Sequence, residues 1–267
     1  MSEPLLVLRA SLAIYAECAR DAFHGLMRNW IIIPWSIGLL IAAFLSMFLL
    51  GQFGDVGGMI AGLVVVALIS YYYSWINAAA GKERLRFSSV LPFDWAIFFS
   101  LVGLTFVLWT ISLLLGQAFA KSPELSWIPI CFNLAIFILL NTLPEEVHEQ
   151  RLDSFPALAA AFQFNKENWI EWYLPLVAIL LPALLADWSI TLVLVAGTDV
   201  LLPIFLPIKA LNIALPTGAL GSELILTVVL EGLLLCLGTW FMLFRTYLFR
   251  ALSQGTRRRR IYQLKQR

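Results

Sequence analysis

The chain has 267 residues, of which 61% are hydrophobic and only 13% are charged, and its net charge is +1. A soluble domain carries about 25% charged residues, so this composition excludes a water-soluble globular protein and indicates a chain whose solvent is mostly lipid. The three cysteines, Cys18, Cys131 and Cys236, lack a metal-type or CxxC spacing and are expected to be small apolar residues of helices.

The first segment, residues 4–29, has the pattern of an amphipathic helix. Apolar residues recur every three or four positions, and charged residues fall on the other side; the apolar set is Leu5, Leu8, Leu12, Ala16, Ala19, Phe23 and Leu26. This pattern predicts an interfacial helix in an N-terminal region of residues 1–29 that lies on the membrane. An ordinary helix packed on the protein's own loops remains the alternative.

Six later stretches are apolar enough to cross a bilayer. Most of them approach the 20 or so apolar residues that cover a hydrocarbon core, and residues 173–186 begin the fifth. They are residues 30–50, 59–76, 95–115, 127–143, 173–186 and 224–249, with a glycine-rich turn expected over 51–58. The sequence therefore predicts an all-α polytopic membrane protein with a six-helix transmembrane domain over residues 30–249.

The basic residues predict the orientation of these spans. Sixteen of the eighteen fall in segments that six spans would place on one side, which leaves only Lys121 and Lys209 on the other. The positive-inside rule then puts both termini, the polar stretch 144–171 and the basic tail 250–267 in the cytoplasm. We expect a multi-pass protein of the inner membrane.

The region 187–222 fits this scheme poorly. It is apolar, yet it contains three prolines and the charged residues Asp187, Asp199 and Lys209. One crossing would move the arginine-rich tail outside, and two crossings need about 40 residues. We therefore expect a re-entrant or interfacial segment on the outer side, where broken backbone is tolerated when it is buried in protein or lines a wet cavity.

A faint internal repeat accompanies the spans. Asn29-Trp30, Asp94-Trp95 and Asn168-Trp169 each precede an odd-numbered span and follow a cytoplasmic segment. This recurrence suggests three tandem units, each a cytoplasmic segment followed by a helix hairpin. The alternative is that tryptophan simply marks three entries into the membrane, where it is enriched.

Glu231 is the charged residue that stands out within a span. It lies about a turn and a half inside the sixth span, where an ionised carboxylate costs at least ~2.5 kcal/mol unless it is partnered. It is a candidate for a proton-linked or substrate-linked acid. A structural hydrogen bond to a neighbouring helix is the alternative.

The two histidines each follow an acidic residue by three positions, in Asp21-x-x-His24 and Glu145-x-x-His148. Such pairs place a carboxylate and an imidazole on one helix face, as carboxylate-bridged dimetal sites do. Both pairs are expected to lie on solvated faces, so no metal and no cofactor is predicted.

Enzyme signatures are absent from the sequence. It has no nucleophile elbow, HExxH, Walker A or GxGxxG motif, and no histidine at bilayer depth. The run Arg257–Arg260 could bind nucleic acid, but beside a membrane helix it is expected to set topology or to contact anionic lipid. We therefore expect a non-enzymatic protein with no nucleic-acid partner.

The layout resembles the permease subunits of ABC-2 type exporters. The shared features are an interfacial helix, six spans, a short charged loop after the second span and a re-entrant element between the last two. In that family the short loop contacts the ATPase, which here implies docking through 82–87, with Lys82, Arg84 and Arg86. The chain departs from the family in its central stretch, because the loop between spans four and five is usually short there.

Residues 12–40 and 152–176 are similar to the repeats of six-helix bacterial inner-membrane proteins built from an amphipathic helix, an Asn-Trp-like step and a hairpin. The resemblance fits the central stretch, and it implies a fold rather than an activity.

The expected role is a transport-related subunit of a membrane complex. The partners would be the lipid bilayer, other protein subunits including a separate ATPase, and a second copy of the chain. The alternative is a scaffold or assembly factor that docks a partner on its central stretch through Phe155, Phe162 and Trp169.

Overall fold

The computed structural model describes residues 3–81, 84–86, 92–119, 123–125, 127–196, 200–207, 209 and 224–254. Within these ranges, side chains are described from residue 11 onward except at 123, 193, 194 and 196, and in the last helix from residue 232. Helices and turns make up these ranges, and no strand occurs within them. Six helical segments are long and apolar enough to cross a membrane. The prediction of an all-α polytopic membrane protein with six spans is confirmed.

The helices follow one another with short connections. They are α1 (Glu3–Arg28), α2 (Ile32–Gly51), α3 (Gly54–Ala80), α4 (Trp95–Phe119), the 3-10 turn η2 (Pro123–Leu125), α5 (Trp127–Leu139), α6 (Leu143–Gln150), α7 (Ser154–Ala186), α8 (Trp188–Ala196) and α10 (Leu224–Ser253). The spans correspond to α2, α3, α4, α5 continued into α6, α7, and α10 from Gly232 onward.

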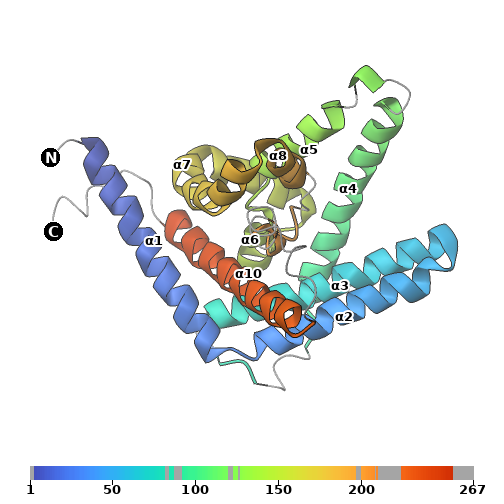
Figure 1. Ribbon diagram of the computed structural model, residues 1–267, viewed down its shortest axis with the longest axis horizontal. Coiled ribbons are helices and arrows are strands. Elements are labelled where there is room, and N and C mark those ends of the chain that lie inside the picture. The colour runs from blue at the N-terminus through green and yellow to red at the C-terminus, as the bar shows by residue number, and fades with distance from the viewer. Residues whose placement is uncertain are drawn as a thin grey trace.

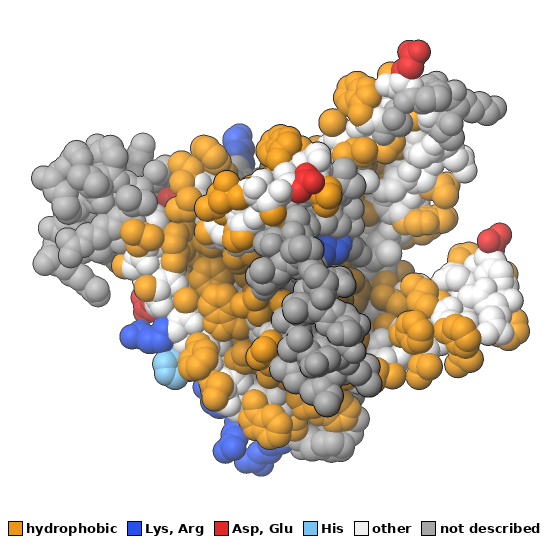
Figure 2. All heavy atoms as spheres, in the orientation of Figure 1, with side chains coloured by type: hydrophobic (Ala, Val, Ile, Leu, Met, Phe, Trp, Pro, Cys, Tyr) orange, Lys and Arg blue, Asp and Glu red, His pale blue; other side chains and the backbone are white. Residues whose placement is uncertain are grey.

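Two helix hairpins project as arms from a common centre (Figure 1). One arm is formed by α2 and α3, and the other by α4 and α5. Hydrophobic side chains cover much of both arms (Figure 2), and α2 is the least buried of the six spans. The largest buried side chains, Trp172, Arg245, Tyr73 and Phe241, belong to α7, α10 and α3, whose packed faces form the core at the centre.

The first arm turns more tightly than expected. The predicted turn over 51–58 was too long, because α3 already begins at Gly54 and only two residues lie between the helices. Gly54 has a φ of +65°, and a Cβ on Gly57 would lie 1.8 Å from the carbonyl oxygen of Leu50. The glycines therefore permit the reversal and the close approach, rather than forming a long loop.

α1 is a helix as predicted, but its apolar residues are divided between two faces. Cys18, Ala22 and Leu26 are buried against the core, and α1 packs along α10. The indole N–H of Trp240 donates to the carbonyl of Ala19 at 3.3 Å. Phe23, predicted to share a face with Leu26, is exposed instead.

The central polar stretch is helical over most of its length. Its first part is the short helix α6, in which every residue from Leu143 to His148 is buried. Its second part is the beginning of α7, a 33-residue helix that continues into the fifth span through a kink at Asn168 (φ −121°, ψ 21°). The expectation of a solvated face for Glu145 and His148 was wrong, because both side chains are fully buried.

The broken backbone of 200–207 lies against α3 and α10. The Tyr73 hydroxyl donates to the carbonyl of Leu201, and Leu201, Ile204 and Leu206 are buried. A Cβ on Gly238 of α10 would lie 2.7 Å from the carbonyl oxygen of Ile204, so only glycine allows this approach. Within the predicted re-entrant segment, residues 200–207 are therefore largely covered by protein, whereas Trp188 and Ile190 at the start of α8 are exposed.

We predict that Gly238→Ala destabilises the protein by about 1–3 kcal/mol, because the added methyl group overpacks the contact with Ile204. Gly232→Ala is the matched control, since a Cβ there meets nothing within 4 Å and alanine favours a helix by about 0.5–1 kcal/mol over glycine. Thermal unfolding in mild detergent should show a lower midpoint for the first variant only. Equal midpoints would contradict a tight contact at residue 204.

Candidate functional site

Helix α6 is short because both of its ends are fixed by the local sequence. Pro144 occupies the first turn, where a missing N–H is tolerated. At the other end Arg151 adopts a left-handed conformation (φ 53°), and its N–H bonds to the carbonyl of Glu146. The spacing of four residues puts Glu145 and Glu149 on one face of this helix, toward α10.

Arg245 of α10 makes the most buried ion pair among the described residues. Its guanidinium binds Glu145 with two hydrogen bonds, from Nε at 2.7 Å and from Nη2 at 2.8 Å. The exposed fractions of the two side chains are 2% and 0%. Arg245 also donates to the side chain and the backbone carbonyl of Asn141, and it lies 4.9 Å above the ring of Trp172. Almost every donor of the guanidinium is thereby used.

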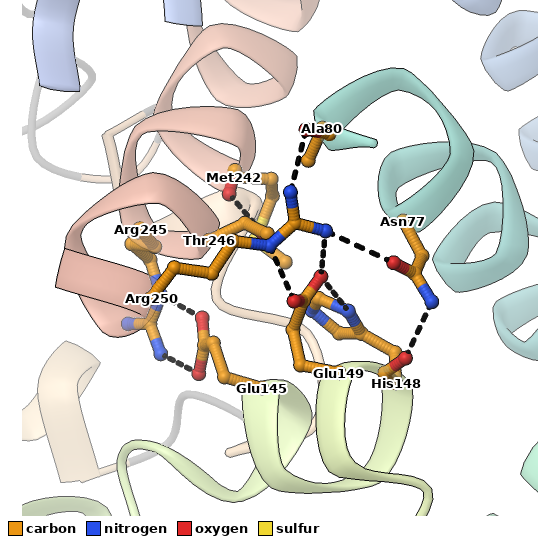
Figure 3. Close-up of polar contacts among 9 residues, drawn as sticks. All are labelled: Asn77, Ala80, Glu145, His148, Glu149, Met242, Arg245, Thr246 and Arg250. Atoms are coloured by element: carbon orange, nitrogen blue, oxygen red, sulfur yellow. Dashed lines mark hydrogen bonds and ion pairs between the residues drawn. The ribbon is translucent and has the colours of Figure 1, made fainter. Parts of the chain in front are cut away.

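Arg250 connects α10 to two other helices (Figure 3). It binds Glu149 of α6 with two hydrogen bonds of 2.5 and 2.8 Å. It also donates to the carbonyl of Ala80 at 2.5 Å and to the side chain of Asn77 at 3.2 Å, both in α3. The amide of Asn77 then donates to the carbonyl of His148 at 2.7 Å. This polar network (Asn77, Asn141, Glu145, His148, Glu149, Arg245 and Arg250) joins α3, α6 and α10.

Two further titratable side chains of α6, Glu146 and His148, are buried, and neither is bonded to Arg245 or Arg250. One carboxylate oxygen of Glu146 and both ring nitrogens of His148 have no hydrogen-bond partner among the described residues. The ring of His148 lies 5.3 Å from that of Tyr73, and its Nδ1 is 3.6 Å from a carboxylate oxygen of Glu149. Glu145 and Glu149 balance the charges of Arg245 and Arg250, so the two pairs join α6 to α10 without a net charge.

Sequence reasoning missed this junction. Arg245 was counted only among the sixteen basic residues assigned to one side of the membrane, although it interrupts the apolar run 240–249 as Glu231 interrupts the start of the same helix. An arginine within an apolar helix and two glutamates four residues apart were the available signals. What was missing was the packing that brings helices 100 residues apart into contact.

The broken segment lines an apolar groove. The groove has a volume of about 340 Å3 and lies between α2, α3, residues 202–205 and α10; its lining includes Leu39, Phe44, Ile69, Tyr72, Phe205 and Leu235. Its volume falls in the range of small-molecule sites. The lining is almost wholly apolar, so the groove suits a hydrocarbon chain rather than a polar ligand.

The polar residues predicted as candidates in the re-entrant segment and the last span lie in different surroundings. Asp187 caps α8, where the backbone N–H of Ile190 and the hydroxyl of Ser189 hold the pKa of its carboxyl below the ordinary range. Lys209 is partly buried and has an interaction partner. Asp199 lies outside the described residues, and so does the side chain of Glu231, whose backbone belongs to α10.

The docking candidates that the structure describes are on the surface. In the short loop after α3, Arg84 and Arg86 are exposed on either side of Leu85. Leu85 is buried, and its N–H donates to the side chain of Asn29 at 2.9 Å. Lys82 lies outside the described residues. Phe155, Phe162 and Trp169 are exposed by 71%, 49% and 62% on the first half of α7.

We predict that Arg245→Met destabilises the protein by about 3–5 kcal/mol, because it leaves the carboxylate of Glu145 buried and unpaired. The double variant Glu145→Leu/Arg245→Met should recover a substantial part of this loss, since an apolar pair carries no desolvation cost. The control is Arg20→Met, whose pair with Asp21 is exposed and spans 4.0 Å, and which should cost under about 1 kcal/mol. Thermal unfolding midpoints in detergent measure all three; a double variant as unstable as the single one would contradict the pairing.

Comparisons with protein-family models, with curated proteins and with solved structures find no match to this chain. The arrangement of its own residues is therefore what supports a function.

Proposed function

We propose that this chain is a non-enzymatic subunit of a transport-related complex of the inner membrane, with both termini in the cytoplasm. The observation that carries the proposal is the broken segment 200–207, which is packed between α3 and α10 and lines the apolar groove. Interrupted helices at membrane depth are a recurring feature of substrate sites in transport proteins. The groove would receive the hydrocarbon part of a lipid or of an apolar cargo.

The short loop after α3 is proposed as the docking site of a separate ATPase. Its described residues support this role, because Leu85 anchors the loop to Asn29 while Arg84 stays exposed beside it. An anchored loop with exposed charges presents a fixed surface, which limits the conformational entropy lost on docking. A second copy of the chain would complete the complex.

Filling the groove should exclude its occupant. Ala43 lines the groove, whereas its neighbour Ala42 is exposed and is not part of the lining. In vesicles containing a phosphatidylcholine with a photoactivatable diazirine acyl chain, we expect the wild-type protein and Ala42→Phe to be labelled on residues 200–207. Ala43→Phe should lose most of that labelling, because the phenyl ring occupies the groove. Equal labelling of the three proteins, read by peptide mass spectrometry, would rule out the groove as an acyl-chain site.

The exporter assignment predicts a stoichiometric ATP-binding partner. Purification of the tagged protein in mild detergent, followed by mass spectrometry, should recover that partner with the wild-type chain and with Arg20→Glu, an exposed control. Arg84→Glu should lose it, because the substitution reverses the charge of the proposed docking loop. Recovery of a different membrane machine, or of no ATPase, would contradict the exporter assignment and favour the scaffold alternative.

A further inference from the structure

Two segments far apart in the chain share a sequence pattern. Residues 22–31 read AFHGLMRNWI and residues 161–170 read AFQFNKENWI, so adding 139 to each number of the first gives its counterpart. Ala, Phe, Asn, Trp and Ile are the same at five of the ten positions. The first segment ends α1 and leads into α2, and the second surrounds the kink that divides α7.

The counterparts are also buried in the same way. Each buried residue in the first set has a buried counterpart in the second: Cys18, Ala22, Gly25, Leu26, Asn29 and Ile32 correspond to Ala157, Ala161, Phe164, Asn165, Asn168 and Glu171. The two asparagines make the same hydrogen bond, since each side-chain amide donates at 3.2 Å to the carbonyl four residues earlier. Chance enrichment of tryptophan at membrane entries does not account for this agreement, so the two segments are copies of one structural unit.

Each copy also exposes an aromatic stripe beside its buried face. Phe23 and Trp30 are exposed by 55% and 65%, and Phe162 and Trp169 by 49% and 62%. At 3.6 residues per turn these positions lie about a third of a turn from the buried asparagine face. The remaining third of each helix carries exposed polar side chains, which are Arg20, His24 and Arg28 in the first copy and Gln163 and Glu167 in the second.

The stripes run into surfaces that face lipid. Trp30 stands at the start of α2, where Leu40 and Ile41 continue the exposed apolar surface, and Trp169 leads to Leu174 and Val177 in the second half of α7. Both helices are long and apolar enough to cross a membrane, so these surfaces are suited to contact with hydrocarbon. The hydroxyl of Tyr15 in α1 donates to the carbonyl of Glu171 just after the kink, at 2.8 Å, so the two helices that carry the copies are in direct contact.

We infer that α1 and the first half of α7 are duplicate anchors that insert their aromatic stripes into the headgroup region of one membrane face. Each stripe is continuous with the exposed apolar surface of a span, and this continuity identifies the bilayer as the partner that covers both. A protein docked on Phe155, Phe162 and Trp169 alone would leave the matching stripe of α1 uncovered. The first half of α7 is therefore a membrane anchor rather than a protein-docking segment.

Spin labels at matched positions test this placement. We would introduce Phe23→Cys and Phe162→Cys on the stripes, with the polar-face counterparts His24→Cys and Gln163→Cys as controls, after replacing Cys131 and Cys236 by serine. Cys18 can remain, because burial raises the pKa of its thiol to about 12 and leaves it unreactive at neutral pH. All four positions are exposed, so the substitutions preserve the fold.

In vesicles of phosphatidylethanolamine and phosphatidylglycerol, labels at 23 and 162 should collide more with oxygen, which dissolves in lipid, than with a water-soluble nickel chelate. Labels at 24 and 163 should show the reverse preference. If the label at 162 were as accessible to nickel as the label at 163, the stripe of α7 would face water and a protein partner would replace the bilayer. If 23 and 162 differed in depth, the two segments would not be equivalent anchors. Neither outcome bears on the acyl-chain groove, so the transport proposal is tested separately.

Discussion

The need to neutralise two arginines inside an apolar protein determines how the last helix packs. Arg245 and Arg250 are separated by little more than one turn of α10, and each finds a carboxylate on the short helix α6. An unpaired buried charge is strongly unfavourable, so the pair of Arg245 with Glu145 constrains the position of α10, and the partly exposed Arg250 adds a second pair. The further bonds from Arg250 to Asn77 and Ala80 add α3 to the same junction.

The polar network holds α3, α6 and α10 together at the centre of the molecule, although the two arms pack weakly. The return helices of the two arms, α3 and α5 with its continuation α6, end at the polar network, and α10 closes it. Lipid tails are as apolar as the side chains of the arms, so burial alone gives helices little reason to associate in a bilayer. Ion pairs and hydrogen bonds at one end supply the specificity that apolar surfaces lack.

The same reasoning applies to the broken segment and to the duplicated helices. Residues 200–207 are tolerated because Tyr73 satisfies a free carbonyl and Gly238 admits the backbone. In the duplicated helices, one face is buried on the core while the next remains available to lipid. A polar backbone group in this protein needs a hydrogen-bond partner, and an apolar face needs an apolar environment, which either protein or lipid can supply.

The sequence by itself determined the fold class and the number of spans, because hydrophobic runs of sufficient length have no other stable solvent than lipid. It also suggested a repeat of three units, at Asn29-Trp30, Asp94-Trp95 and Asn168-Trp169. The tertiary structure alone decided that Glu145 and His148 are buried, that Arg245 belongs to the core, and that Phe23 and Leu26 lie on different faces. Those outcomes depend on contacts between residues a hundred or more positions apart, such as Glu145 and Arg245, which local patterns signal only weakly.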